Sequence, residues 1–292
     1  MKLNLIMTTR NLSSPLTERF LNGLKKQPVE VKEKIHLFAV IQHEFCGDKI
    51  VDGIEQTVIV AEPCSLSHAR NIGLKALPNE EGIVCFPDDD CYYNETVLKF
   101  VLDGFQKEKC DIFSTGYFDP ITGSYHGRNR TPYVREVLTE KNMLEKPVSS
   151  TIFVKYNTPN ELPLFDERFG VGTEWGSGEE TDFILELYAQ GKKGVYNSND
   201  FVYHDYWRDK DENITSITKY TVGFAVMMQK SLILRGQKIA YKSFRKILFR
   251  TFVATVLYMV KPAKRKVYSA RFKGYKKGIK IGKKYFKNAT DK

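Results

Sequence analysis

Short apolar runs alternate with amphipathic segments over the first part of the chain. Five runs are rich in aliphatic residues and have the composition of buried strands: 3–7, 35–41, 57–61, 82–87 and 111–117. Three intervening segments place apolar residues on one face at helical spacing: 16–26, 65–77 and 94–105. Strands and helices that alternate in this way predict βαβ units and a mostly parallel sheet.

The alternation is less regular after residue 117. Two further strands are expected at 148–156 and 194–203, and helices at 181–190 and 214–235. A glycine-rich stretch at 170–178 is expected to form a loop. The pattern predicts an α/β domain over residues 1–210, followed by a basic amphipathic helical extension over residues 211–292.

Three consecutive carboxylates follow the predicted strand at 82–87, namely Asp88, Asp89 and Asp90. Clustered carboxylates repel one another unless water or a cation meets them, and Mg²⁺ or Mn²⁺ is the natural partner of oxygen ligands. A solvated acidic turn is the alternative interpretation. Ligands of open α/β sheets bind at the carboxyl ends of strands, so residues 8–10 are expected to face the same crevice.

Composition limits the class of protein. The 292 residues are 42% hydrophobic and 13% aromatic, which is enough for a folded core. Five cysteines without a C-x-x-C spacing favour reduced thiols over a disulfide framework or a zinc site. No stretch is long and apolar enough to predict a membrane-spanning helix or a secretory signal, so a cytoplasmic location is expected.

The charge is unevenly distributed. Residues 235–292 contain 19 of the 45 basic residues and one of the 35 acidic residues, whereas residues 1–234 contain 26 and 34. The body therefore carries a charge of about −8 and the C-terminal segment about +18, within a net charge of +10. A basic appendage on an acidic body indicates a catalytic unit with a surface that binds anions.

Four motifs occur in an order that resembles family 2 glycosyltransferases. They are SHARNIGL at 67–74, FPDDD at 86–90, FDE at 165–167 with WGSGEETDF at 175–183, and His204. The resemblance covers residues 3–207. It implies a GT-A fold, with a Rossmann-like mixed sheet flanked by helices. It also implies transfer of a sugar from a nucleoside diphosphate donor (EC 2.4), usually with inversion at the anomeric carbon.

The resemblance also implies roles for the residues around the acidic cluster. Asp88–Asp90 resemble the D-x-D element, with Asp90 the best candidate for direct contact with Mn²⁺ or Mg²⁺, and with Asp88 and His204 as further candidate ligands. Five residues are implied to contact the nucleotide sugar: Thr8, Arg10, Arg70, Asp88 and Asp89. His204 could equally be a buried, hydrogen-bonded histidine.

The acidic pair Glu179–Glu180 matches the family's catalytic "ED" position, with Glu in place of the usual Asp. The acceptor hydroxyl must lose a proton as it attacks, and a carboxylate within hydrogen-bond reach serves as the general base. Our hypothesis is that Glu180 is this base, with Glu179 and Asp182 as alternatives. The structural alternative is that these acids only complement the dipole of a helix that begins here.

The C-terminal segment contains ten uncharged residues at 251–260, bracketed by Lys and Arg. This arrangement favours binding to the surface of an anionic bilayer. We therefore expect a peripheral enzyme at the inner face of the plasma membrane, with a saccharide or lipid-linked acceptor, in cell-surface polysaccharide biosynthesis. Two alternatives are a nucleotidyltransferase and a nucleic-acid-binding protein that stacks bases on Tyr275, Tyr285 and Phe286, although no nucleic acid partner is expected.

Overall fold

The computed structural model describes residues 1–47, 49–125, 133–205 and 213–290. The chain forms two compact units, which are described in turn. The first comprises Met1–Thr139, Glu145–Leu164 and Gln190–Tyr206, and the second comprises Glu140–Leu144, Phe165–Ala189 and Trp207–Lys292. This division does not coincide with a boundary at residue 210, because the stretch from 165 to 189 associates with the C-terminal helices.

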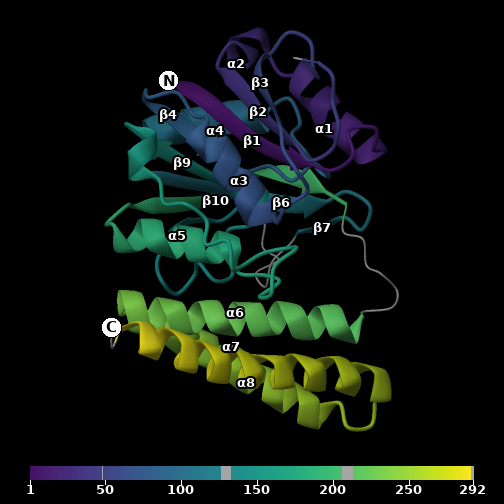
Figure 1. The fold of residues 1–292 in the computed structure, drawn as a ribbon, viewed down its shortest axis with the longest axis vertical. Helices are drawn as coiled ribbons and strands as arrows, with labels where there is room; N and C mark the ends of the chain where they lie inside the picture. Colours follow the sequence, from purple (N-terminus) through teal and green to yellow (C-terminus); the bar gives the residue numbers. More distant parts are fainter. Residues whose placement is uncertain (48, 126–132, 206–212, 291–292) are drawn as a thin grey trace. The chain divides into compact units, whose positions relative to one another are not determined.

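A mixed sheet forms the centre of the first unit (Figure 1). Its strands are β1 (Lys2–Thr9), β2 (Ile35–Ile41), β3 (Glu55–Val60), β4 (Gly82–Cys85), β5 (Cys91–Tyr92), β6 (Ile112–Asp119), β7 (Ser124–Tyr125), β8 (Arg135–Val137), β9 (Ile152–Tyr156) and β10 (Gly194–His204). The order is β3-β2-β1-β4-β9-β6-β10-β5, with β7 on β6 and β8 on β10. Of the strands in this order, only β9 and β5 run antiparallel to the rest. The predicted α/β class with a mostly parallel sheet is confirmed.

Helices cover both faces of this sheet. They are α1 (Pro15–Lys25), α2 (Val29–Lys32), α3 (Leu66–Lys75) and α4 (Val97–Glu108), together with the 3₁₀ turns η1 (Ser149–Thr151) and η2 (Pro159–Glu161). Strand side chains alternate between faces, so Leu5 and Met7 join the core with α1 and α4. Ile6 points the other way and packs at Gly73 of α3, where an added Cβ would lie 2.3 Å from its side chain.

The starts of the first and third helices follow from the sequence. Ser14 caps α1 by accepting a hydrogen bond from the backbone N–H of Leu16, and Pro15 occupies the first helical position. Ser65 caps α3 in the same way, through the backbone N–H of His68. Each helix therefore begins after a short loop that follows a strand, and it returns the chain along the sheet.

The second unit is helical, and three of its helices lie side by side (Figure 1). It contains α5 (Glu179–Ala189), α6 (Ile214–Arg235), α7 (Lys238–Leu257) and α8 (Pro262–Thr290). Gly274, Gly278 and Gly282 are spaced four apart on α8 and face α6. A Cβ at Gly278 would lie 2.4 Å from the carbonyl oxygen of Val222, so only glycine permits this close approach.

The helical structure predicted for the C-terminal segment is confirmed. The packing of these helices bears on the alternative that the segment binds nucleic acid. Tyr275 and Phe286 are buried in the second unit, and only Tyr285 among the three candidate stacking residues is exposed. This burial opposes base stacking on the segment. No helix in the described ranges combines the length and apolar character needed to cross a bilayer.

Candidate active site

The pairing of β1 with β4 determines where the acidic cluster Asp88–Asp90 lies. Leu5 of β1 lies opposite Cys85 of β4, and the same register continues beyond β4 as a bridge between Thr8 and Asp88. The carboxyl end of β1 therefore lies directly beside the start of the acidic cluster. The predicted meeting of residues 8–10 with the three aspartates occurs at this edge, through Thr8 and its neighbour Thr9.

Both carboxylate oxygens of Asp88 accept hydrogen bonds. The guanidinium of Arg70 donates to Oδ1 at 2.9 Å, and the hydroxyl of Ser149 donates to Oδ2 at 2.9 Å. Arg70 is only 1% exposed, whereas a third of the Asp88 side chain reaches solvent. Asp88 is thus held in one orientation by a buried cation, which leaves it less available than Asp90 as a metal ligand.

Asp89 has a different partner and a different environment. The hydroxyl of Thr9 donates to its Oδ2 at 2.5 Å. Burial raises the pKa of the Asp89 carboxyl, and the neighbouring charges of Asp90 and Asp88 raise it further, against the effect of the Thr9 hydrogen bond. Thr9 was expected at this edge only as part of residues 8–10, and Ser149 was not predicted, because neither belongs to a distinctive motif.

Asp90 contacts His204, which was also expected as a candidate metal ligand. β5 pairs antiparallel with the end of β10, so that Cys91 lies opposite His204, and this places His204 Nε2 3.1 Å from Asp90 Oδ1. Burial opposes a charge on His204, but its hydrogen bond to Asp90 and the surrounding carboxylates raise its pKa.

A second cation, Arg19 of α1, supports the same segment. Its guanidinium donates to Asp205 Oδ2 at 2.6 Å and to the carbonyl oxygen of Asp90 at 3.3 Å. It also lies 4.5 Å from the centre of the Tyr92 ring. Arg19 and Asp205 were not predicted, because they come from segments outside the recognised motifs.

Arg10 lies at the same edge of the sheet but does not contact the acidic cluster. It is exposed and donates to the carbonyl oxygen of Cys64 at 2.6 Å. The backbone N–H of Cys64 in turn donates to Gln42 at 2.9 Å. These contacts join the loops that follow β1, β2 and β3, and leave the Arg10 side chain accessible to a ligand.

The residues around Asp90 fit a divalent cation that also binds a substrate. In the described ranges, no group of three or more His, Cys, Asp and Glu side chains is arranged as a metal cage. Asp90 and His204 instead provide one oxygen and one nitrogen donor in contact with each other. Mg²⁺ and comparable cations are often held by one or two carboxylates together with substrate phosphates, and imidazole suits transition metals.

The candidate base residues belong to the second unit, in the first turn of α5. Asp182 is buried between two cations, with Lys230 Nζ at 2.6 Å and an Arg235 guanidinium nitrogen at 2.5 Å. Lys230 also donates to Asp166. Both carboxylate oxygens of Asp182 are therefore engaged by cations of the second unit.

Asp166 extends this ion network. Burial opposes its charge, but the hydrogen bond from Arg168 and the charge and hydrogen bond of Lys230 lower its pKa to about 2. Asp166 belongs to the FDE motif, so the network connects that motif to Asp182 through Lys230 of α6. The network holds the first turn of α5 on α6.

The two glutamates of this turn differ in accessibility. Glu179 is 6% exposed, whereas Glu180 is partly exposed. Among the residues that the structure describes, the Glu180 carboxylate has no hydrogen-bond or ion-pair partner. Glu180 is therefore the candidate base that remains available to another molecule.

Trp175, in the loop before these acids, has a structural role. It is 3% exposed and packs against Phe286 and Tyr285 of α8, with ring centres 6.1 and 5.3 Å away. Arg168 lies over the same aromatic group. Trp175 therefore serves in the packing of the second unit.

Comparison with known proteins identifies structures of similar fold. No protein-family model and no curated protein sequence matches the chain. It is structurally similar to residues 1–349 of S. aureus TarS in complex with UDP-GlcNAc, at 17% identity and a TM-score of 0.57, over 98% of this chain and 92% of that one. It is also similar to the mannosyltransferase PcManGT from Pyrobaculum calidifontis in complex with GDP-Man and Mn²⁺, at 13% identity and a TM-score of 0.63, over 95% and 87% of the two chains.

These similarities establish the GT-A fold of glycosyltransferases that was expected from the sequence motifs. At such low identity they establish the fold alone.

Proposed function

We propose that the protein is a glycosyltransferase that transfers a sugar from a nucleoside diphosphate donor. The observation that carries this proposal is the arrangement at the carboxyl edge of β1 and β4. There, the contact between Asp90 and His204 lies beside an Asp88 that is held by buried Arg70. The similar structures were solved with UDP-GlcNAc and with GDP-Man and Mn²⁺, which supports a nucleotide-sugar donor.

The side chains of the cluster have separate tasks in this proposal. Asp90 and His204 would hold Mn²⁺ or Mg²⁺, which when bound stabilises the charge that develops on the leaving diphosphate. Arg70 and Ser149 fix Asp88, and Thr9 fixes Asp89, and in this proposal the two carboxylates would accept hydrogen bonds from hydroxyl groups of the donor. Arg10 and Thr8 line the side expected to receive the nucleotide.

Glu180 is the proposed general base, and the proposed reaction is hexosyl transfer with inversion. In an inverting transfer the acceptor hydroxyl attacks the anomeric carbon as the bond to the diphosphate breaks. The hydroxyl must lose its proton in this step, and a carboxylate without competing partners can accept it. Glu180 meets that requirement better than Asp182, which is held between Lys230 and Arg235.

The expected test of the donor is a thermal-shift screen of nucleotide sugars with and without Mn²⁺. A donor that binds only the folded protein raises the unfolding temperature, by an amount equivalent to about 2.7 kcal/mol at a hundredfold excess over Kd. We expect a UDP-sugar or GDP-sugar to stabilise the protein, and Mn²⁺ to increase the effect. If no nucleotide sugar stabilises it under either condition, the proposed function is wrong.

The acceptor is proposed to be a saccharide, or a lipid-linked saccharide reached at an anionic membrane surface. The turn between α7 and α8 is the part of the second unit suited to that surface. Leu257 is 72% and Val260 86% exposed, and exposed Lys261, Lys264 and Arg265 follow directly. Apolar side chains next to a group of cations are typical of segments that enter the interface of anionic bilayers.

The full chain is expected to sediment with phosphatidylglycerol vesicles in low salt. Replacing Leu257 and Val260 with serine should lower the partition coefficient for the vesicles by about tenfold, because two apolar side chains no longer enter the interface. Val29→Ser, which changes a residue that is 64% exposed on α2, is the matched control and should bind as the unaltered chain.

Point substitutions are preferred to a truncation at residue 234, because α8 packs along α6 and its removal would expose the core of the second unit. Equal binding to uncharged phosphatidylcholine vesicles, or unchanged binding of the double variant, would contradict the membrane proposal without affecting the donor proposal.

A further inference from the structure

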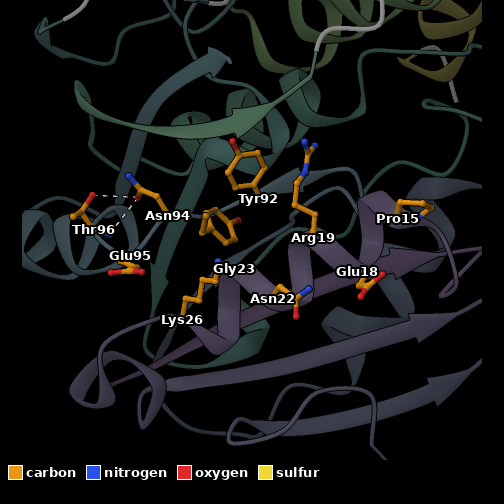
Figure 2. A pocket seen from close by; sticks show the side chains of 11 residues that line it. Pro15, Glu18, Arg19, Asn22, Gly23, Lys26, Tyr92, Asn94, Glu95 and Thr96 are labelled. Carbon is orange, nitrogen blue, oxygen red and sulfur yellow. Dashed lines mark hydrogen bonds between the residues drawn. The ribbon is translucent and has the colours of Figure 1, made fainter. Parts of the chain in front are cut away.

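A cavity of about 680 Å³ lies between α1 and the segment that follows β5, within the first unit (Figure 2). Figure 2 shows Arg19 and Asn22 of α1, with Lys26 at the C-cap of that helix, on one side and Asn94, Glu95 and Thr96 on the other. The volume falls within the range of about 300–1,000 Å³ that is typical of small-molecule sites. None of the residues that line this cavity belongs to the sequence motifs described above.

Close packing and hydrogen bonds hold the floor of the cavity. Gly23 allows α1 to approach the chain at Tyr93 closely, since a Cβ there would lie 2.7 Å from the Tyr93 carbonyl oxygen. Gln27 donates to the carbonyl oxygen of Asn94 at 2.7 Å, and the Asn94 side chain accepts hydrogen bonds from Thr96 and from the backbone of Val97. A cavity whose floor is fixed in this way is preformed for a ligand.

The rim, in contrast, offers polar groups that are not engaged. Among the described residues, the side chains of Glu18, Asn22, Lys26 and Glu95 have no hydrogen-bond or ion-pair partner. With Arg19, the lining carries two positive and two negative charges, so it favours neither an anion nor a cation. A neutral lining with carboxylate, amide and ammonium groups matches a ligand that both donates and accepts many hydrogen bonds.

The geometry points to a neutral saccharide as the ligand of this cavity, at a site separate from the acidic cluster. The Tyr92 ring already contacts Arg19, at 4.5 Å, and stacks on Tyr203, at 5.1 Å, so recognition rests on hydrogen bonds at the rim. Arg19 connects the two sites, because its guanidinium also bonds the carbonyl oxygen of Asp90. On the proposed function, the site would hold part of the acceptor or product chain.

Binding of disaccharides to the full chain tests this inference, measured by calorimetry and saturation-transfer NMR. The panel consists of chitobiose, mannobiose, galactobiose and cellobiose. At least one is expected to bind without donor or metal. The double variant Asn22→Ala/Glu95→Ala should raise its Kd by about tenfold or more, since two or more hydrogen bonds are lost. Asn22→Trp, which fills the cavity from its rim, should abolish binding.

Lys25→Ala is the matched control, because Lys25 is exposed on α1 but does not line the cavity. Its Kd for the disaccharide should equal that of the unaltered chain, and the thermal shift caused by a nucleotide sugar should be the same in all variants. The inference is wrong if no disaccharide binds, or if the double variant and Asn22→Trp bind as tightly as the control. Either result would leave the donor proposal intact.

Discussion

Replacing Glu180 with glutamine is expected to lower sugar transfer by about 10²–10⁴-fold while the donor binds as before. Glutamine has nearly the same shape as glutamate but cannot accept the proton of the acceptor hydroxyl. Because Glu180 is partly exposed and has no partner among the described residues, the substitution should leave the free energy of unfolding unchanged. The measurement is single-turnover transfer, alongside the donor-induced thermal shift.

Glu174→Gln provides the matched control, since Glu174 is an exposed carboxylate in the loop before α5. Its variant should transfer sugar at the normal rate. Glu179→Gln tests the first alternative base, and a larger loss there than at Glu180 would reassign the role. Normal turnover by Glu180→Gln would exclude Glu180 as the base.

Asp182 requires a different interpretation, because its substitution would also affect stability. Asp182→Asn removes a charge that neutralises Lys230 and Arg235, which are both largely buried. Breaking a buried ion pair by removing one partner costs about 3–5 kcal/mol. Loss of transfer by that variant would therefore reflect a disturbed α5, and only a variant of normal stability can identify a base.

Sequence patterns predicted the regular elements well, because local signals determine them. The helix expected at 214–235 is α6 with the same bounds, since Asn213 caps its start and Gly236, in the left-handed conformation, ends it. The strands expected at 35–41 and 194–203 correspond to β2 and β10, the latter one residue longer. Apolar periodicity and cap residues are sufficient signals for such elements.

The contacts within the site were less accessible to sequence reasoning, because they depend on pairings between distant segments. Asp90 reaches His204 only because β5, a strand of two residues, pairs with β10. A strand this short has no periodicity to detect. Likewise Ser149, in a 3₁₀ turn, lies 61 positions along the chain from the Asp88 that it binds.

The three aspartates differ in their hydrogen-bond partners, and only the structure revealed these partners. The sequence left Asp88, Asp89 and Asp90 as equivalent carboxylates, although the resemblance favoured Asp90 for the metal. In the structure, Arg70 and Ser149 engage Asp88, Thr9 engages Asp89, and His204 meets Asp90. Asp90 alone is paired with a second side chain that can bind a metal.

Asp90→Ala is accordingly expected to abolish the increase in donor binding that Mn²⁺ produces. Substitution of residues that only support metal ligands weakens metal affinity by about 10–100-fold, so removal of a direct ligand should cost at least about 100-fold. Asp90 is about a third exposed, and His204 can become neutral when its partner is removed, so the variant should fold normally. The measurement is the Kd of Mn²⁺ in the presence of the donor, by calorimetry.

Asp103→Ala is the control for this experiment, because Asp103 lies on α4 and pairs only with Lys99 among the described residues. It should bind Mn²⁺ and donor as the unaltered chain does. His204→Ala should weaken Mn²⁺ binding in the same direction as Asp90→Ala, since the two side chains would share one cation. Unchanged Mn²⁺ affinity in Asp90→Ala would place the metal elsewhere, and Asp90 and His204 would then form only a structural hydrogen bond that holds β5 against β10.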